Sequence, residues 1–341
     1  MKAVVYSRAG GPEVLRLAER PVPEPGPGEL RVKVKVSAVN PSDWKAREEG
    51  SRLGGTSPFP EIVPNQDGAG IVDAVGPDVS GFEAGQRVWL LEAARQRPTG
   101  TAQEYVVLPA ERVVPLPGQA SFDLGATLGV PALTAHRALT VADQGPRQLV
   151  PGALRGRGVL VSGGAGVVGH AAIELARWAG AEVVTTVSSD EKAVLARAAG
   201  AHHVVNYRTT NAAEAVRKIC PDGIDVVVEV APAANADLNQ AVLAPYGTIA
   251  VYANNGGEAM TVPLRPLMAA NARYQFIWVY TVPKAAKAQA IEDVSAAVAA
   301  GALRVGEEAG LPLHRFPLEC TADAHAAVEA GAVGKILIDV G

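Results

Sequence analysis

The chain has 341 residues, of which 48% are hydrophobic and 19% are charged, and this length predicts two domains with separate cores. Its formal net charge of −4, without any dense run of Lys or Arg, argues against a nucleic-acid-binding or anionic-membrane-binding surface. The first residues form no apolar leader, no stretch is long and apolar enough to span a bilayer, and the two distant cysteines form no CxxC pair, so we expect a cytoplasmic protein.

The first third of the chain predicts a β-rich domain. Residues 30–39, LRVKVKVSAV, alternate apolar with basic side chains, which is the period of a half-buried strand. The runs at 67–76, 85–91 and 103–117 are also β-rich, and Gly and Pro separate them. This pattern predicts a small barrel-like β domain.

The pattern changes near residue 121 to helices and buried strands. A helical segment at 121–139 precedes a polar stretch rich in Gly and Pro, and short, continuously apolar strands then alternate with helices up to a last strand near 272–280. Such strands predict a doubly wound parallel sheet with helices on both faces, an α/β fold. We interpret residues 141–158 as a surface insertion.

The sequence VLVSGGAGVVG (159–169) contains the most informative glycines. Gly164, Gly166 and Gly169 form a G-x-G-x-x-G pattern that follows an apolar strand and opens a helix, which is the context in which this pattern binds a dinucleotide. Small residues let the backbone approach a pyrophosphate, and the helix N-terminus supplies N–H donors. We therefore expect a bound dinucleotide here rather than a tight turn without a ligand.

The end of the next strand, in VVTTVSSDEK (183–192), indicates which dinucleotide binds. NAD-binding proteins usually place an acid there, whereas this chain has Val187 followed by Ser188 and Ser189. The two hydroxyls, Lys192 one turn further on and Tyr207 at the end of the third strand suit a 2′-phosphate, and they predict NADPH. The alternative is that Lys192 is a solvated helix residue and Tyr207 a packing residue.

Motifs spread along nearly the whole chain resemble those of one family. They are MKAVVYSRAGGPEVL, VPEPGPGELRVKVKVSAVNPSD, DGAGIVDAVGPDVSGFEAGQRV, TAQEYVVLPAERVVPLP, ATLGVPALTAHRAL, AHHVVNYR and AVGKILIDV. With them the chain resembles the zeta-crystallin-like quinone oxidoreductases of the medium-chain dehydrogenase/reductase superfamily. The resemblance implies a GroES-like catalytic domain formed by residues 1–125 and 285–341, a Rossmann domain at 126–284, NADPH in a cleft between them, and a homodimer.

The resemblance also implies which residues bind NADPH. It assigns the cofactor loop to Ala165, Gly166, Val167 and Val168, the 2′-phosphate to Ser188, Lys192 and Tyr207, and the nicotinamide half to Asn40, Thr134, Tyr252, Ala253, Asn254 and Lys335. Family members often have a substrate-facing tyrosine where this chain has Lys45, beside Trp44. This departure weakens any substrate preference taken from the family.

Zinc enzymes occur in the same superfamily, and their ligand positions are altered here. The usual cysteine is Asn40, the usual His-Glu pair is Gln66-Asp67, and the four-cysteine structural lobe is missing. A catalytic zinc ion needs converging Cys, His or carboxylate ligands and an open position. We therefore expect no metal and no Lewis acid for alcohol oxidation. Asn40, Lys45 and Gln66 are candidates to hydrogen-bond the oxygen of a substrate, and each could equally be structural.

Together these features predict an NADPH-dependent reductase that transfers a hydride to a quinone without zinc. A quinone or a conjugated enone is already electrophilic, so the protein mainly has to position the reactants and exclude water. The alternative of the same fold is a 2-alkenal or enoyl reductase. Some members of the family act as crystallins or bind RNA, and the net charge and the lack of a basic stripe argue against RNA binding. An apolar last strand near 274–280 predicts a homodimer through edge pairing.

Overall fold

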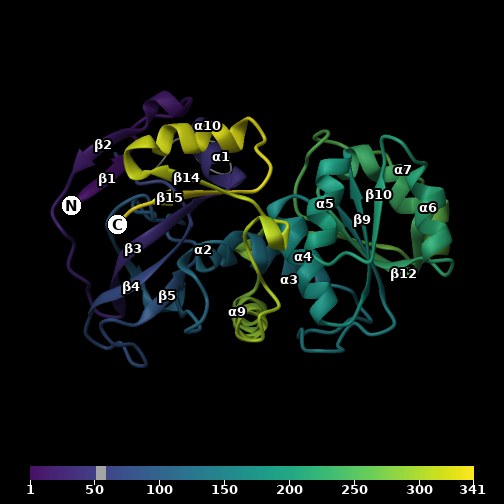
Figure 1. Cartoon of the computed structure of the whole chain (residues 1–341), viewed down its shortest axis with the longest axis horizontal. Coiled ribbons are helices and arrows are strands. Elements are labelled where there is room, and N and C mark those ends of the chain that lie inside the picture. The colour runs from purple at the N-terminus through teal and green to yellow at the C-terminus, as the bar shows by residue number, and fades with distance from the viewer. Residues whose placement is uncertain (51–58) are drawn as a thin grey trace. The chain divides into compact units, whose positions relative to one another are not determined.

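The computed structural model describes residues 1–50 and 59–341, which form two compact units. The first unit comprises Met1–Val130 and Leu313–Gly341, and the second comprises Pro131–Pro312 (Figure 1). The division falls inside a short π-helical turn, η3 (Leu128–Ala132).

One boundary differs from the sequence-based expectation, because residues 285–312 belong to the second unit. They include α9 (Lys284–Ala299), which packs on α3 (Leu133–Leu139). A buried hydrogen bond of 2.7 Å between His136 Nε2 and Asp293 Oδ2 joins the two helices. The helix periodicity of this segment was visible in the sequence, but its packing partner was not.

The first unit is a β-rich domain, as the sequence predicts. Along β3, Val32 and Val34 are fully buried and the intervening Lys33 is exposed, which is the alternation expected of a strand with one face on a core. A seven-stranded sheet has the order β14-β15-β3-β4-β5-β7 with β6 paired to β3, and β1 pairs with β2. The strands are β1 (Lys2–Val5), β2 (Arg16–Glu19), β3 (Glu29–Val39), β4 (Asp67–Val75), β5 (Arg87–Leu90), β6 (Tyr105–Pro109), β7 (Val113–Pro115), β14 (Leu313–Pro317) and β15 (Lys335–Asp339).

Short helices connect and cover these strands. They are η1 (Pro12–Val14), α1 (Pro41–Glu49), η2 (Ala110–Arg112), α2 (Phe122–Gly125), η6 (Leu318–Cys320) and α10 (Thr321–Glu329). The strand β15 runs antiparallel to β3, with Ile336 opposite Val39, and β4 runs antiparallel to β3, with Asp67 opposite Ala38. The end of β3 therefore lies beside the starts of β4 and β15, and α1 begins at the same place.

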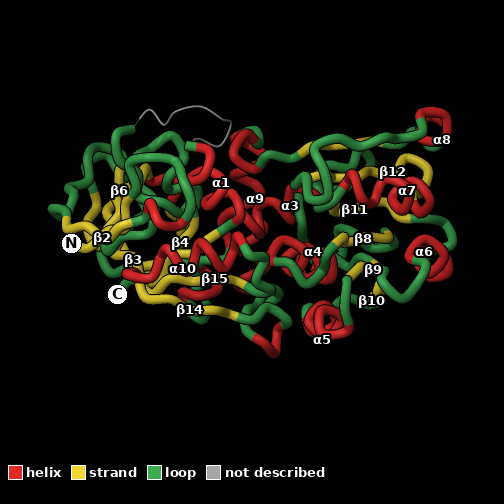
Figure 2. Tube along the Cα trace, turned by 90° about the horizontal axis from the view of Figure 1, so that it is seen from above, coloured by secondary structure: helices red, strands yellow, loops and turns green. Residues whose placement is uncertain are grey.

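The second unit is a parallel sheet with helices, again as predicted. Six strands pair in the order β10-β9-β8-β11-β12-β13, and every pairing is parallel. Figure 2 shows β8 to β12 of this sheet with helices around them. The strands are β8 (Gly158–Ser162), β9 (Glu182–Val187), β10 (His203–Asn206), β11 (Ile224–Glu229), β12 (Leu243–Val251) and β13 (Arg273–Phe276). The remaining helices are α4 (Val167–Trp178), α5 (Asp190–Ala198), α6 (Ala212–Ile219), α7 (Pro232–Val242), α8 (Leu264–Ala269), η4 (Val279–Thr281) and η5 (Glu307–Ala309).

The strand order identifies the edge of this sheet at which a ligand would bind. From β8 the chain continues to β9 and β10 on one side, and the strands from β11 onward lie on the other side. Successive strands are thus added on opposite sides of the boundary between β8 and β11, which is a topological switch point. In open parallel sheets, ligands bind at such a point, at the carboxyl ends of the strands. The glycine loop follows β8 and therefore lies at this edge.

The stretch 141–158 is not wholly a surface insertion. Leu149 and Leu154 are buried, and the Leu149 backbone N–H donates to Asp293 Oδ2 at 2.7 Å. The polar composition concealed two core leucines that anchor this stretch to the second unit.

Among the described residues, no helix is long and apolar enough to cross a bilayer.

Candidate active site

The glycines between β8 and α4 let the chain pack closely where the strand turns into the helix. A Cβ atom on Gly164 would lie 2.1 Å from Thr185 Oγ1 of β9, and one on Gly169 would lie 2.4 Å from the Gly163 carbonyl oxygen. Helix α4 can therefore start close to the sheet only with glycine at these positions. Its N-cap, Gly166, has no side chain to bond the first N–H groups, which leaves them for an anion.

The side chains predicted to bind a 2′-phosphate lie at the ends of the two neighbouring strands. Val187 and Asn206 are opposite each other at the ends of β9 and β10. Beyond them, Lys192 Nζ donates to Ser188 Oγ at 3.1 Å, and Tyr207 is about half exposed. The structure thus brings the predicted serine, lysine and tyrosine to one edge of the sheet.

Two residues of this stretch have roles other than those expected from the sequence. Ser189 is the N-cap of α5 and accepts a hydrogen bond from the Lys192 backbone N–H at 3.3 Å. Val187 is buried, so an acid at that position would be enclosed in protein, and Ser188 is the residue that occupies the accessible position. The sequence analysis missed Arg208, whose guanidinium lies over the Tyr207 ring, 5.7 Å from its centroid.

A buried carboxylate ends β11 beside the glycine loop's strand. Glu229 Oε2 accepts hydrogen bonds from Ser162 Oγ at 3.1 Å and Asn239 Nδ2 at 2.7 Å. Its Oε1 accepts from the Ala231 backbone N–H at 2.6 Å and from Asn235 Nδ2 at 2.9 Å. Four donors satisfy this charge, and they fix the turn after β11 against the end of β8. Sequence reasoning missed this residue, although a lone acid closing an apolar strand was a usable signal.

The segment predicted to border the nicotinamide follows β12. The Tyr252 backbone N–H donates to the Glu229 carbonyl oxygen at 3.0 Å, and Asn254 Nδ2 donates to Glu258 Oε1 at 2.6 Å. Burial raises the pKa of the Tyr252 phenol, and the Glu229 carboxylate raises it further. Ala253 continues the same loop, and Thr134 is buried in α3, which contacts β11 and β12.

The first unit contains a compact cluster of charged and amide groups where β3, β4 and β15 meet. Lys335 Nζ donates to Asn40 Oδ1 at 2.7 Å and to the Val39 carbonyl oxygen at 3.3 Å. Asn40 Nδ2 in turn donates to Asp67 Oδ2 at 2.8 Å. All three polar side chains of this chain of bonds are at most 2% exposed.

The remaining contacts of this cluster come from two other segments. The Val130 backbone N–H donates to Asp67 Oδ2 at 2.9 Å, and the Asn40 backbone N–H donates to Asp43 Oδ2 at 2.8 Å. A Cβ atom on Gly129 would lie 2.1 Å from Asp67 Oδ1, so glycine is needed there. Among the described residues, Asp67 Oδ1 has no hydrogen-bond partner.

Burial dominates the protonation of this cluster. Burial raises the pKa of Asp67 to about 7; the Lys335 ammonium opposes this shift, and Asp43 adds to it. Burial lowers the pKa of Lys335, against the attraction of the Asp67 and Asp43 carboxylates. Burial thus favours the neutral forms of Asp67 and Lys335, whereas the attraction between these two groups favours their charged forms.

The other two predicted substrate-side residues, Gln66 and Lys45, are near Asp67 and Asn40 in the sequence and differ from each other in burial. Gln66 is fully buried, and in the described part of the chain neither its Nε2 nor its Oε1 has a partner. Such an amide is costly to bury unless a ligand or water completes its bonds. Lys45 on α1 is half-buried, with its Nζ 5.7 Å from the centroid of the Trp44 ring.

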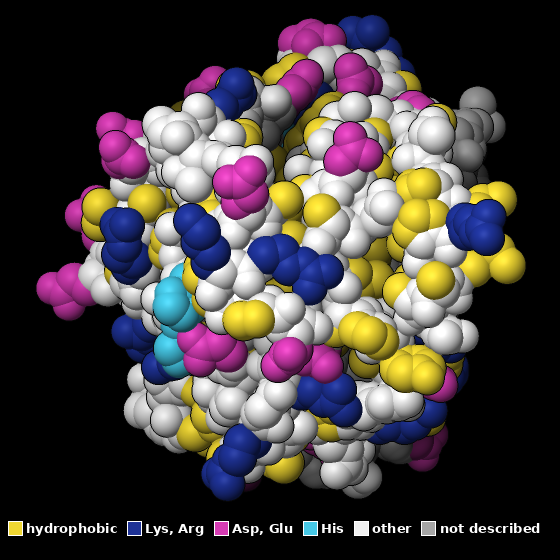
Figure 3. Space-filling model, turned by 90° about the vertical axis from the view of Figure 1, so that its right-hand side faces the viewer, with side chains coloured by type: hydrophobic (Ala, Val, Ile, Leu, Met, Phe, Trp, Pro, Cys, Tyr) yellow, Lys and Arg dark blue, Asp and Glu magenta, His cyan; other side chains and the backbone are white. Residues whose placement is uncertain are grey.

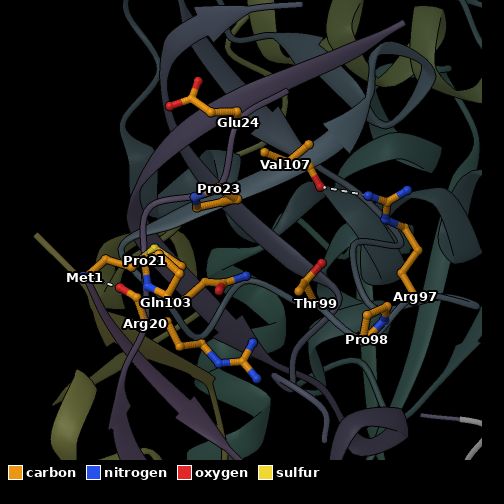
Figure 4. A pocket seen from close by; sticks show the side chains of 10 residues that line it. All are labelled: Met1, Arg20, Pro21, Pro23, Glu24, Arg97, Pro98, Thr99, Gln103 and Val107. Carbon is orange, nitrogen blue, oxygen red and sulfur yellow. Dashed lines mark hydrogen bonds between the residues drawn. The ribbon is translucent and has the colours of Figure 1, made fainter. Parts of the chain in front are cut away.

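A separate pocket of about 490 Å³ in the first unit contains none of the predicted site residues. Its two arginines are already paired, Arg20 with Glu61 and Arg97 with Glu29, and Arg97 also donates to the Val107 carbonyl oxygen (Figure 4). The pocket is lined by Met1, Arg20, Pro21, Pro23, Glu24, Arg97, Pro98, Thr99, Gln103 and Val107. Both arginine side chains of this pocket are therefore already engaged by carboxylates.

Comparison with known proteins explains why these two groups of residues occur in one chain. Residues 26–118 match the alcohol dehydrogenase GroES-like domain, and residues 167–299 match the zinc-binding dehydrogenase family. The quinone oxidoreductase of Pongo abelii is 30% identical over 99% of this chain and 97% of its own. The chain belongs to the quinone oxidoreductase family.

Solved structures of similar proteins share the whole fold of this family member. A mycobacterial protein complexed with NADPH is 28% identical and has a TM-score of 0.81, with 99% of each chain covered. A protein described as an NAD-dependent alcohol dehydrogenase is 30% identical and has a TM-score of 0.84, with 100% of each chain covered. The predicted fold class, family and enzyme class are thereby confirmed, and the second unit is a nicotinamide-dinucleotide-binding Rossmann domain.

The zinc in the name of one matching family raises the question of whether this quinone oxidoreductase homologue could hold that metal. At the altered ligand positions the donors are two amides, Asn40 and Gln66, and one carboxylate, Asp67. The Asn40 oxygen is already bonded by an ammonium group, and a second cation there would face electrostatic repulsion. These residues do not fit a zinc site, and among the described residues no three His, Cys, Asp or Glu side chains gather as metal ligands.

Proposed function

We propose that this oxidoreductase transfers a hydride from NADPH to a quinone without a metal. The observation that carries the proposal is the end-to-end similarity to quinone oxidoreductases, together with an ammonium group in place of zinc ligands. NADPH, when bound, supplies a hydride from C4 of its nicotinamide. A quinone accepts that hydride readily because its rings and carbonyls delocalise the charge, so no Lewis acid is required.

Within this proposal the first unit supplies hydrogen bonds to the acceptor. Gln66 has an unpartnered Nε2 group and Asn40 retains a second Nδ2–H beyond its bond to Asp67, so both amides have donors left for a quinone oxygen. Lys45 is half-buried on α1, and its ammonium group is a third candidate donor. The buried position of the amides excludes water from competing for the same oxygen.

The preference for NADPH rests on the ends of β9 and β10. Ser188, Lys192 and Arg208 offer one hydroxyl and two cations, and Tyr207 adds a phenol. The mycobacterial relative bound to NADPH supports this preference, whereas the relative described as NAD-dependent makes NADH the competing cofactor. These two cations would stabilise the negative charge of a bound 2′-phosphate through charge-assisted hydrogen bonds.

One panel of assays tests the proposal. NADPH and NADH are each combined with 1,4-benzoquinones, 2-alkenals and simple alcohols, and bound zinc is measured by elemental analysis. We expect quinones to be reduced fastest, with NADPH, by protein that holds no stoichiometric zinc and keeps its rate in chelator. Faster turnover of a 2-alkenal would favour the enoyl-reductase alternative. Alcohol oxidation with NAD⁺, lost on chelation, would reject the proposal.

We also propose a homodimer formed through β13, which is one of the two edge strands of the six-stranded sheet. Phe276 on this strand is 64% exposed and Trp278 beyond it is 42% exposed. Figure 3 shows one face of the molecule, on which hydrophobic side chains lie scattered among charges of both signs. An apolar edge strand favours pairing with a second copy. Light scattering should give a dimer for the wild type and a monomer for Phe276→Glu. Val194→Glu, a change at an exposed valine on α5, should remain dimeric.

A further inference from the structure

The bonds among Lys335, Asn40 and Asp67 run in one direction. The ammonium donates to the amide oxygen, and the amide nitrogen donates to the carboxylate. A donor bound at an amide oxygen draws electron density from the nitrogen and strengthens both of its N–H groups as donors. One of those N–H groups binds Asp67, and the other is available to a ligand.

The charge on Asp67 controls how strongly the second N–H group of Asn40 donates to a ligand. An ionised Asp67 binds the amide N–H strongly and compensates the ammonium charge of Lys335. A protonated Asp67 does neither, and the positive charge of Lys335 is then felt through Asn40. The groups facing Asp67 are Lys335 from β15, Asn40 and Asp43 from the start of α1, and the Val130 N–H.

Resting on the proposed function, we propose that Lys335 is a positioning residue that strengthens, through the Asn40 amide, the hydrogen bond to the acceptor oxygen, and that Asp67 regulates this strength by gaining or losing a proton. The hydride brings two electrons and one hydrogen nucleus to the acceptor, negative charge develops on its oxygen, and a proton from solvent completes the hydroquinone. Lys335 and Asn40 form no covalent bond in this sequence.

The first test varies how much the acceptor depends on that hydrogen bond. Single-turnover rates of NADPH oxidation are measured for 1,4-benzoquinones with zero to four methyl groups, whose reduction potentials fall along the series. We expect Lys335→Met to lower the rate with the tetramethyl compound by roughly ten-fold or more, which is the size of one charge-assisted hydrogen bond. The rate with the unsubstituted compound should fall by no more than about three-fold, because this stronger oxidant depends less on that bond. Lys335→Arg, which keeps the cation, should recover most of the loss, and Lys33→Met, at an exposed lysine on β3, should match the wild type.

The second test follows the rate against pH. The wild-type rate on the tetramethyl compound should fall as pH rises through the titration of Asp67, because the carboxylate then compensates the ammonium charge. Asp67→Asn should remove this fall and keep the higher rate. Asp73→Asn, at a carboxylate on the same strand β4 that pairs with Arg31, should keep the wild-type profile.

The outcomes separate this inference from the proposed function. A wild-type enzyme that reduces none of the quinones removes the proposed function itself. An active enzyme in which Lys335→Met slows all quinones equally, or weakens NADPH binding measured by cofactor fluorescence, overturns the inference and places Lys335 at the cofactor instead. Should Lys335→Met not fold, the double variant Lys335→Met/Asp67→Asn removes the ammonium and the Asp67 carboxylate together, and it should show the steep dependence on reduction potential with a flat pH profile.

Discussion

The buried polar cluster of the first unit and the polar residues that follow β9 and β10 differ most in their access to water. Asn40, Asp67 and Lys335 are almost completely buried and bond to one another, whereas Lys192 is half-buried and Arg208 is exposed. Water solvates and screens an exposed charge, so its removal costs little. A buried charge has only its protein partners, so its removal leaves them unpaired. Equal chemical changes in the two regions should therefore have unequal effects.

The largest expected effect is on the buried side. Lys335→Met leaves Asp67 without its cation, and we expect a loss of about 3–5 kcal/mol in the free energy of unfolding at pH 9. At pH 6 the loss should be smaller, because Asp67 can take up a proton. Urea unfolding at both pH values measures this, with Lys33→Met as a control that should stay within about 0.5 kcal/mol of the wild type. Equal losses at both pH values would contradict the coupling to Asp67.

The second effect is the pH dependence that Asp67 gives to stability. Burial raises its pKa from the 3.8 of an exposed aspartate to about 7 in the folded protein. Because folding raises this pKa, the stabilising contribution is complete below the unfolded value and is lost as pH rises to about 7. The difference between wild type and Asp67→Asn should therefore shift against the wild type by at most about 4 kcal/mol between pH 4 and pH 8. A constant difference across this range, measured by denaturant unfolding, would show that Asp67 titrates normally.

Substitutions at the exposed residues that follow β9 and β10 should have a smaller effect, and only on the affinity for NADPH. We expect Lys192→Ala to weaken NADPH binding by about ten-fold, the low end for a charge-assisted hydrogen bond in a partly solvated place, and to leave NADH nearly unchanged. Arg208→Ala should behave alike, and Ser188→Asp should penalise NADPH by repulsion. Dissociation constants from cofactor fluorescence at fixed ionic strength test this. If Lys192→Ala weakens both cofactors equally, this residue does not bind a 2′-phosphate.

The smallest effect should come from the phenol beside those cations. Tyr207→Phe removes one exposed hydrogen bond but keeps the ring under the Arg208 guanidinium, so we expect NADPH to weaken by about two- to three-fold. Tyr207→Ala also removes the ring and should cost more if the ring holds Arg208 in place. Identical losses in the two variants, in the same fluorescence titration, would assign the whole effect to the hydroxyl.

Patterns confined to one segment were enough to predict much of this molecule. The alternation in 30–39 and the apolar runs between helices predicted the two kinds of sheet, because these patterns record which faces are buried. The glycines after β8 predicted a dinucleotide-binding turn, and the structure gives the steric reason at Gly164 and Gly169. The family resemblance identified the right positions without giving their contacts.

Contacts between distant segments were not predictable from local pattern. The bond between Lys335 and Asn40 joins residues 295 positions apart, and neither neighbourhood indicates a buried ion. Asn40, Gln66 and Asp67 were recognised only as altered zinc ligands, so the ammonium among them was missed. Arg208 directly follows Tyr207 and was within reach of the sequence, whereas the packing of α9 on α3 depends on a partner that periodicity does not name.

The pairing of β15 with β3 also determines the order in which this chain can fold during synthesis. Domains fold as units as the nascent chain emerges, usually from the N-terminus onward. Here the second unit is continuous, while the first unit lacks β14 and β15 until residue 339 has left the ribosome. The second unit is thus complete first, although it starts later in the chain, and the edge of β3 that pairs with β15 stays open to mispairing or chaperone binding until β15 is made. Slowed translation across 313–339 should lengthen the protease-sensitive lifetime of the first unit and spare the second.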